Sequence, residues 1–114
     1  MKKICNFALA LLIALPCVAQ KESNHVRQGN KQYNKENYTE AEVSYRRALD
    51  KNKQSFQAHF NLGDALFKQG KYDEAIQEFN AAKPFIKADN KKQAAAVEHN
   101  IGNANFAQQN FQQA

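Results

Sequence analysis

The three histidines are the side chains of this sequence best suited to metal binding or proton transfer. His25 and His59 stand at equivalent positions of two repeated segments of the chain, so they are expected in successive structural units and not side by side. No cysteine or nearby carboxylate completes a ligand set with either of them or with His99. We therefore predict packing roles for all three, with no metal site and no cofactor.

Other reaction chemistry finds little support. The sequence has no glycine-rich phosphate loop and no serine in the context of a nucleophile elbow. The paired acids Glu40/Glu42 and Asp73/Glu74 open predicted helices, where negative charge suits the helix dipole. Net charge is +5, but basic and acidic residues alternate through 36–53 and 68–92, which is typical of a solvated helical surface. We predict that the protein is not an enzyme and does not bind nucleic acid.

A sequence repeat organises the chain. Gly29 returns as Gly63, and the segment Asn37–Ala41 matches Lys71–Ala75 at the same interval. A fixed period in this range indicates a repeat protein, in which each unit stacks on its neighbours and exposes an extended surface. The other matched pairs are Tyr38/Tyr72, Ala41/Ala75, Tyr45/Phe79 and Ala48/Ala82.

The spacing of apolar residues within each unit predicts helices and no strands. Apolar residues recur at three- and four-residue spacings, as expected of amphipathic helices that pack on one another. Ser55 is a plausible N-cap, and Gly70 suits the end of a helix. The fold class is therefore all-α. The predicted helices cover about 23–35, 38–52, 55–69, 72–82 and 90–108, with a sixth starting near Phe111.

These residues resemble the tetratricopeptide repeat (TPR) family, whose helix–turn–helix unit is about 34 residues long. The unit 56–89 fits best, through Leu62-Gly63, Leu66, Tyr72, Ala75, Phe79 and Ala82. The unit 22–55 departs from the pattern at Gln28 and Gln32, as expected of a polar end repeat. The resemblance implies a helical solenoid over 20–114, with two full repeats and a truncated third at about 95–114.

The third unit begins late. Gly102 follows Gly63 at a longer interval than Gly63 follows Gly29, and the extra residues fall between Pro84 and Ala94. Either the linker or the fifth helix is therefore longer than in the preceding unit. The pattern stops soon after the start of the last predicted helix, which is expected if the chain is a fragment of a longer protein.

The resemblance also implies a binding wall, formed by the first helix of each repeat. Recurrent asparagines on this wall can both donate and accept hydrogen bonds, so they could hold a peptide backbone whatever its side chains. The aromatic residues could supply apolar contact, or could only pack between helices. The implied binding residues are Arg27, Asn30, Tyr33, Asn34, Phe60, Asn61, Asp64, Phe67, Lys68, His99, Asn100 and Asn103, with Val26 and Phe106 beside them.

One binding mode of the family is a clamp for C-terminal carboxylates, which requires cations at fixed repeat positions. Asn30 and Asn61 match that clamp, but Val26, Ala96 and Asn100 stand where its cations belong. Without those cations a carboxylate would lose its charge-assisted hydrogen bonds. We predict that the protein lacks this clamp.

Residues 1–19 have the pattern of a secretory signal peptide. Lys2 and Lys3 precede a mostly apolar run over 4–15, and small residues precede a cut after Ala19. Uncleaved anchoring, or lipidation of Cys17, are alternatives. Cleavage would lower the net charge to +3 and remove both cysteines. We expect an exported protein, periplasmic or associated with the inner membrane, whose mature chain does not bind lipid directly.

The segments 28–33, 58–66 and 99–103 are similar to exported TPR proteins of bacterial aerotolerance (Bat) operons. That resemblance implies a scaffold with a protein or peptide partner, such as a membrane-anchored von Willebrand factor A protein. Two alternatives remain open: a purely structural repeat segment of a longer protein, or an accessory region of an enzyme whose catalytic part lies beyond residue 114.

Overall fold

The computed structural model describes the backbone of residues 21–113 and the side chains of 21–110, and all its regular elements are helical. The first helix occupies 21–34. It is followed by α2 (Tyr38–Lys51), α3 (Phe56–Lys68), α4 (Tyr72–Ala82), the short 3-10 helix η1 (Lys83–Phe85) and α5 (Lys91–Gln113). The all-α prediction is confirmed. The predicted signal peptide and both cysteines lie outside the described residues.

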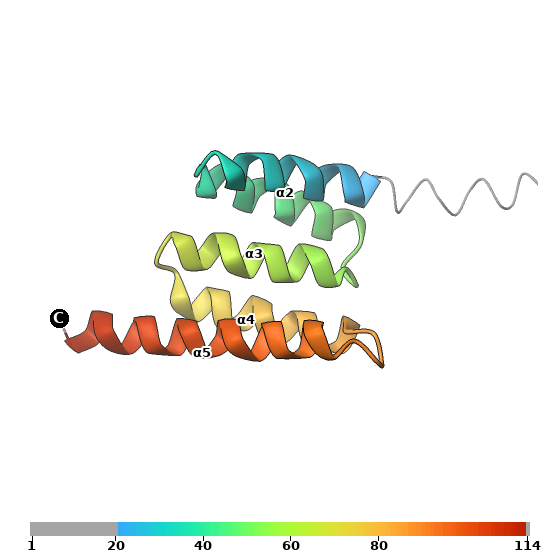
Figure 1. The fold of residues 1–114 in the computed structure, drawn as a ribbon. Helices are drawn as coiled ribbons and strands as arrows, with labels where there is room; N and C mark the ends of the chain where they lie inside the picture. The colour runs from blue at the N-terminus through green and yellow to red at the C-terminus, as the bar shows by residue number, and fades with distance from the viewer. Residues whose placement is uncertain (1–20, 114) are drawn as a thin grey trace, which may run out of the picture.

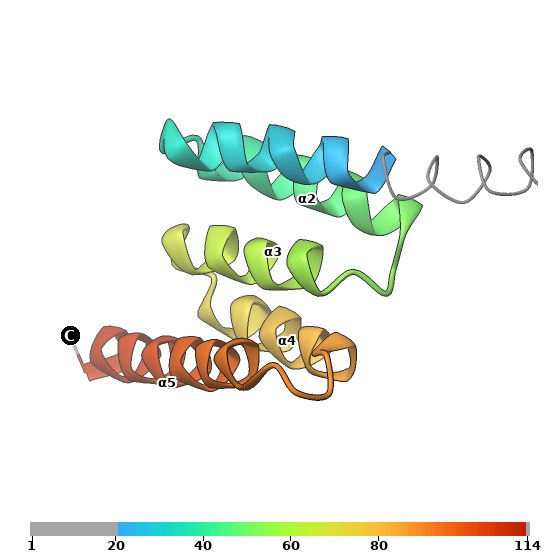
Figure 2. The same cartoon turned by 45° about the vertical axis from the view of Figure 1, so that its right-hand side comes forward.

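Successive helices run antiparallel and stack in chain order (Figure 1). Residues 21–34, α3 and α5 lie on one side of the stack, and α2 and α4 lie on the other, as the turned view also shows (Figure 2). Short turns enforce this arrangement because they leave no room for a crossover. The first helices of the repeats therefore form one continuous face.

Close packing within each pair depends on a glycine that faces an aromatic ring. Gly29 is buried against Tyr45, and Gly63 is buried against Phe79. Each ring occupies the space that a β-carbon would need, so the two helices approach more closely than larger residues would allow. The rest of the buried core consists mainly of aliphatic side chains, among them Ala41, Leu62, Ala65, Leu66, Ala75 and Val97.

The turns inside the two repeats share one hydrogen-bond pattern. The amides of Gly70 and Lys71 donate to the carbonyls of Phe67 and Leu66, both at 2.9 Å, and this pair of bonds closes α3 as a Schellman motif. Gly70 has a φ of 77°, which confirms its predicted role at the helix end. In the first repeat Glu36 takes that place with a φ of 64°, a conformation that favours glycine.

The linkers and the start of α5 explain the late start of the third unit. The Ser55 hydroxyl accepts a hydrogen bond from the Ala58 amide at 3.1 Å, so its predicted N-cap role is confirmed. Between α4 and α5 the chain forms η1 and then a loop, and the Asn90 side chain accepts from the Gln93 amide at the start of α5. α5 begins eleven residues before Gly102, whereas α3 begins seven residues before Gly63, so four of the five extra residues lengthen the start of α5.

The prediction of a helix break before Phe111 was wrong, because α5 continues to Gln113. Gln109 stands where Glu36 and Gly70 adopt positive φ, and that conformation costs a non-glycine residue about 1–2 kcal/mol. In the first repeat the packing of α2 offsets this cost at Glu36, and in the second repeat Gly70 avoids it. No second helix packs at Gln109 within the described residues, so continuing the α-helix is the more stable course.

None of the helices in the described part of the chain is both long enough and apolar enough to span a membrane.

Candidate functional site

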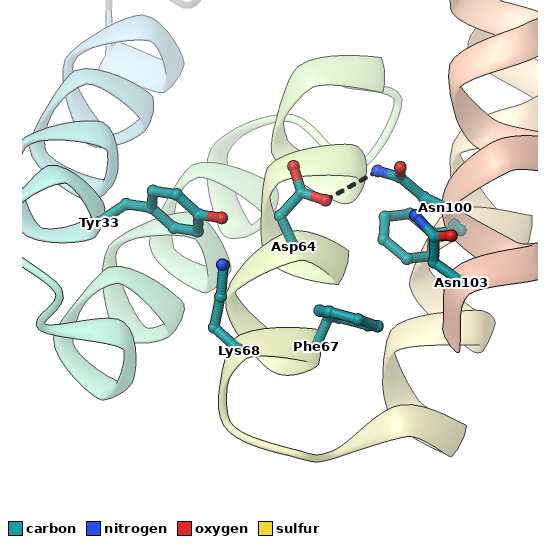
Figure 3. Close-up of a pocket in the computed structure, with 7 residues that line it drawn as sticks. Tyr33, Asp64, Phe67, Lys68, Asn100 and Asn103 are labelled. Atoms are coloured by element: carbon teal, nitrogen blue, oxygen red, sulfur yellow. Dashed lines mark hydrogen bonds between the residues drawn. The ribbon is translucent and has the colours of Figure 1, made fainter. Parts of the chain in front are cut away.

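Two neighbouring hollows lie along the face formed by the first helices, and we call them together the groove. One hollow, of about 270 Å³, lies between α3 and α5, and the other, of about 320 Å³, lies between residues 21–34 and α3. Tyr33 and Asp64 line both hollows, so they lie where the two hollows meet. Figure 3 shows the residues of the hollow between α3 and α5. The remaining lining residues are Asn30, Tyr45, Gln57, Asn61, Phe67, Lys68, Phe79, Asn100 and Asn103.

Asparagine side chains connect the first helices across the groove. The Tyr45 hydroxyl donates to Asn30 Oδ1 at 2.6 Å, and Asn61 Nδ2 donates to the same oxygen at 3.1 Å. Asn30 thereby keeps its own N–H groups, and Asn61 keeps its carbonyl oxygen, without a hydrogen-bond partner among the described residues. The two amides are thus held in place while retaining a free donor and a free acceptor.

Asp64 carries the negative charge of the groove. Its Oδ1 accepts a hydrogen bond from Asn100 Nδ2 at 2.9 Å, which links α3 to α5 (Figure 3). Burial raises the pKa of Asp64 to about 6, because the loss of hydration outweighs the opposing effects of the Lys68 charge and the Asn100 hydrogen bond. The carboxylate is therefore only partly compensated by the protein.

The two tyrosines of the groove respond to the same environment. Burial, and then the nearby Asp64 charge, raise the pKa of Tyr33 and of Tyr45 above that of a free phenol. Both hydroxyls are therefore neutral hydrogen-bonding groups at physiological pH.

The structure brings eight of the predicted binding residues together in the groove and leaves four outside it. Arg27, Asn34 and His99 are exposed and line neither hollow. Phe60 also lines neither, because its ring packs between Phe56 and Phe79 with ring centroids 5.4 and 5.6 Å away. Ligand contact by any of the twelve stays a prediction. The eight in the groove are Asn30, Tyr33, Asn61, Asp64, Phe67, Lys68, Asn100 and Asn103.

The aromatic residues divide between the two roles that the sequence left open. Tyr33 and Phe67 pack edge-on against Tyr38 and Tyr72, and both still line the groove. Phe106 is 64 % exposed, so it neither packs between the described helices nor lines the groove. Val26 packs against the core.

Sequence reasoning missed three lining residues. Gln57 stands at the second position of its repeat, which the register of the family already assigns to the binding wall. Tyr45 and Phe79 come from the second helices, and they reach the groove because Gly29 and Gly63 leave space beside them. No sequence signal distinguishes this contact with the groove from ordinary core packing, because both side chains are almost fully buried.

The histidines lie apart from one another and outside the groove. His59 Nδ1 is 2.8 Å from Glu78 Oε2, its Nε2 is 2.9 Å from the Lys53 carbonyl oxygen, and its ring stacks on Phe85. His99 is exposed, so the packing role predicted for it was wrong. The buried Nδ1 of His25 has no hydrogen-bond partner among the described residues. Within 21–110, no three histidine, cysteine or acidic side chains are grouped as a metal site would require.

Comparison with known proteins agrees with this geometry. No curated protein matches the sequence. The family model of the tetratricopeptide repeat matches residues 26–95, which include α2, α3 and α4 entirely. The antiparallel helix pairs, the glycine–aromatic contacts and the repeated turns are those of a helical repeat array, a type of fold that generally serves as a scaffold for other proteins. The chain therefore belongs to the tetratricopeptide repeat family.

Proposed function

We propose that the protein is a scaffold that holds an extended segment of a partner protein in the groove. The observation that carries this proposal is the row of amide side chains from three successive first helices: Asn30, then Asn61, then Asn100 and Asn103. Side-chain amides can match the donors and acceptors of an extended backbone. The backbone groups of the ligand recur at regular intervals along its length, and the amides recur from one repeat of the array to the next.

The groove is suited to binding more than to catalysis. Its polar groups are mostly neutral amides and phenols, and its charged residues, Asp64 and Lys68, lie one turn apart on the same helix. Tyr33 and Phe67 add apolar surface beside the amides. A ligand would thus gain both hydrogen bonds and apolar contact, the combination found in specific protein-binding sites.

The test compares variants that remove amides from opposite faces. Asn61→Ala combined with Asn103→Ala alters the groove, whereas Gln77→Ala combined with Asn80→Ala makes the matched change at exposed positions of α4. We expect capture of partner proteins from a cell-envelope extract to be lost only in the groove variant. Thermal melts would establish that both variants are folded. Equal capture by the two variants would rule out the groove as the binding surface.

Export and a role in an aerotolerance complex form the finer part of the proposal. The signal-like composition of residues 1–19 supports export, and the resemblance of 28–33, 58–66 and 99–103 to Bat proteins supports a membrane-anchored von Willebrand factor A partner. Cell fractionation with N-terminal sequencing tests export, and we expect the mature protein to begin at Gln20.

Co-purification from membranes tests the partner, and we expect a von Willebrand factor A protein in the isolated complex. An intact Met1 on cytosolic protein, or absence of a von Willebrand factor A protein from the isolated complex, would refute the respective part.

A purely structural role is the second candidate, and one observation favours it. Phe106 is 64 % exposed on α5, and nothing lies within 4 Å of a β-carbon built on Gly102. That face of α5 could stack on another helix in the way that Gly29 and Gly63 receive their rings. If it does so without ligand binding, changes in the groove would leave every interaction of the protein unaltered.

A further inference from the structure

Asp64 is the only acidic residue among those that line the groove, and it stands at the centre of the groove. It comes from α3, the middle of the three first helices, and lies between Tyr33 on one side and Asn100 on the other (Figure 3). A ligand that extends from one hollow to the other must therefore pass this carboxylate.

The hydrogen-bonding capacity of Asp64 is not filled by the described part of the protein. Oδ1 accepts from Asn100, whereas Oδ2 accepts no hydrogen bond from any described residue. Lys68 is one helical turn away, but it is exposed and forms no ion pair with Asp64. A carboxylate withdrawn from water without a full set of donors carries an unfavourable desolvation energy, which a cationic ligand can offset.

The surroundings of Asp64 suit a cation with an apolar stem. Tyr33 and Phe67 line the same hollow of about 270 Å³, and aromatic rings attract cations through their electron-rich faces. Asn103, also in this hollow, can accept a hydrogen bond through its carbonyl oxygen. Besides the exposed Lys68, which also lines it, the hollow therefore combines a negative charge, aromatic walls and a neutral acceptor.

We propose that this hollow is a specificity pocket for a lysine or arginine side chain of the bound segment, with Asp64 as its counter-ion. This inference rests on the proposed function, since it identifies one side chain of the ligand whose backbone the amides would hold. The N–H groups of the basic side chain donate to Asp64 Oδ2 in charge-assisted hydrogen bonds, and its methylene stem lies along Phe67. A ligand carboxylate at this point would instead be repelled.

Binding in this pocket depends on pH through Asp64. α3 presents Lys68 beside Asp64, and the raised pKa values of Tyr33 and Tyr45 keep both phenols neutral. α4 presents Phe79, and α5 presents the amides of Asn100 and Asn103. Among the residues that line the groove, Asp64 is therefore the one whose pKa, raised to about 6, lies between pH 7.5 and 5. Its protonation removes the attraction, so affinity falls as the pH falls through about 6.

A phage-displayed library of random dodecapeptides, selected on the purified protein, is the probe that tests the pocket. We expect selected sequences to be enriched in lysine or arginine, although the protein itself is basic and would disfavour such peptides non-specifically. The best binder is then synthesised with its lysine replaced by norleucine, or its arginine by citrulline. Each replacement should weaken binding about tenfold, a typical loss for one charge-assisted contact.

Asp64→Asn retains the size of the side chain and removes its charge, and Asp50→Asn, at an exposed site on α2, is the matched control. Asp64→Asn should weaken binding of the basic peptide about tenfold, leave binding of the norleucine or citrulline peptide unchanged and abolish the pH dependence. Asp50→Asn should leave binding of both peptides and its pH dependence unaltered.

Peptides that bind without basic residues, or that bind the Asp64→Asn variant with equal affinity, would refute the pocket. If their binding is still lost in the Asn61→Ala/Asn103→Ala variant, the proposed function survives. If no peptide binds, or if binding is insensitive to both groove variants, the two proposals fail together.

Discussion

The ring of Phe79 lies so close to Gly63 that a β-carbon on Gly63 would stand 2.5 Å from ring atom Cε1. The same relationship joins Gly29 to Tyr45 in the first repeat. Each glycine sits on the first helix of its pair and each ring on the second, so this contact sets how closely the two helices pack. It also gives Tyr45 and Phe79 access to the groove.

Gly63→Ala should destabilise the protein, because the buried Phe79 ring cannot move without disturbing the core. Overpacking of this kind typically costs about 1–3 kcal/mol, even though alanine favours helix by about 1 kcal/mol over glycine. Gly102→Ala is the control at the equivalent position of α5, where no atom lies within 4 Å of the new β-carbon. It should stabilise the protein by about 0.5–1 kcal/mol. Urea denaturation measures both changes, and equal effects would contradict this account.

Glu36→Gly should raise the free energy of unfolding, because Glu36 holds a φ of 64° in a turn that glycine adopts without strain. The gain should not exceed about 1–2 kcal/mol, since glycine also increases the entropy of the unfolded chain. The reciprocal change, Gly70→Ala at a φ of 77°, should cost about 1 kcal/mol although nothing near it is displaced. Thermal denaturation measures both. Destabilisation by Glu36→Gly would show that the glutamate side chain stabilises the turn.

Asp64→Asn should stabilise the protein at pH 8 by about 1–3 kcal/mol, since the folded chain keeps a partly dehydrated carboxylate. The pKa of Asp64 is raised to about 6 from 3.8, so the folded state binds its proton more tightly than the unfolded state. The wild-type protein therefore loses stability as the pH rises from about 4 to 6, and the variant lacks this loss. Urea denaturation at several pH values measures the difference, which should vanish below pH 4. A constant difference at every pH would contradict the assignment.

His59→Ala should destabilise the second repeat, because His59 joins three segments of the chain. The substitution leaves the Glu78 carboxylate and the Lys53 carbonyl without their hydrogen-bond partner, and it removes the ring that stacks on Phe85. We expect a loss of about 1–3 kcal/mol in urea denaturation. His99→Ala, at an exposed position of α5, should change stability by less than about 0.5 kcal/mol. A similar small effect at both sites would show that the His59 contacts contribute nothing net.

The part of the fold that could be predicted from the sequence is the part that follows from the repeat register. Four helices and their turns follow from features within the chain's own period, such as the Ser55 cap and Gly70. The positive φ of Glu36 could not be anticipated, since glutamate has no preference for it and the turn forms because the two flanking helices pack together. The continuation of α5 through Gln109 was missed for the converse reason: the repeat pattern predicts a turn, but no described helix packs there to stabilise it.

In the groove, too, some features follow from the sequence and others only from the tertiary structure. The residue types and their spacing determined that Asn30, Asn61, Asp64 and Asn100 share one face, because residues at equivalent positions of stacked repeats must lie in a row. Only the tertiary structure decided that Asp64 is partly dehydrated with one oxygen free of protein donors, that Phe60 is taken up by packing, and that Tyr45 and Phe79 reach the groove. Periodicity specifies the direction of a side chain, whereas its hydration and free hydrogen-bonding groups depend on which neighbours surround it once the helices have packed.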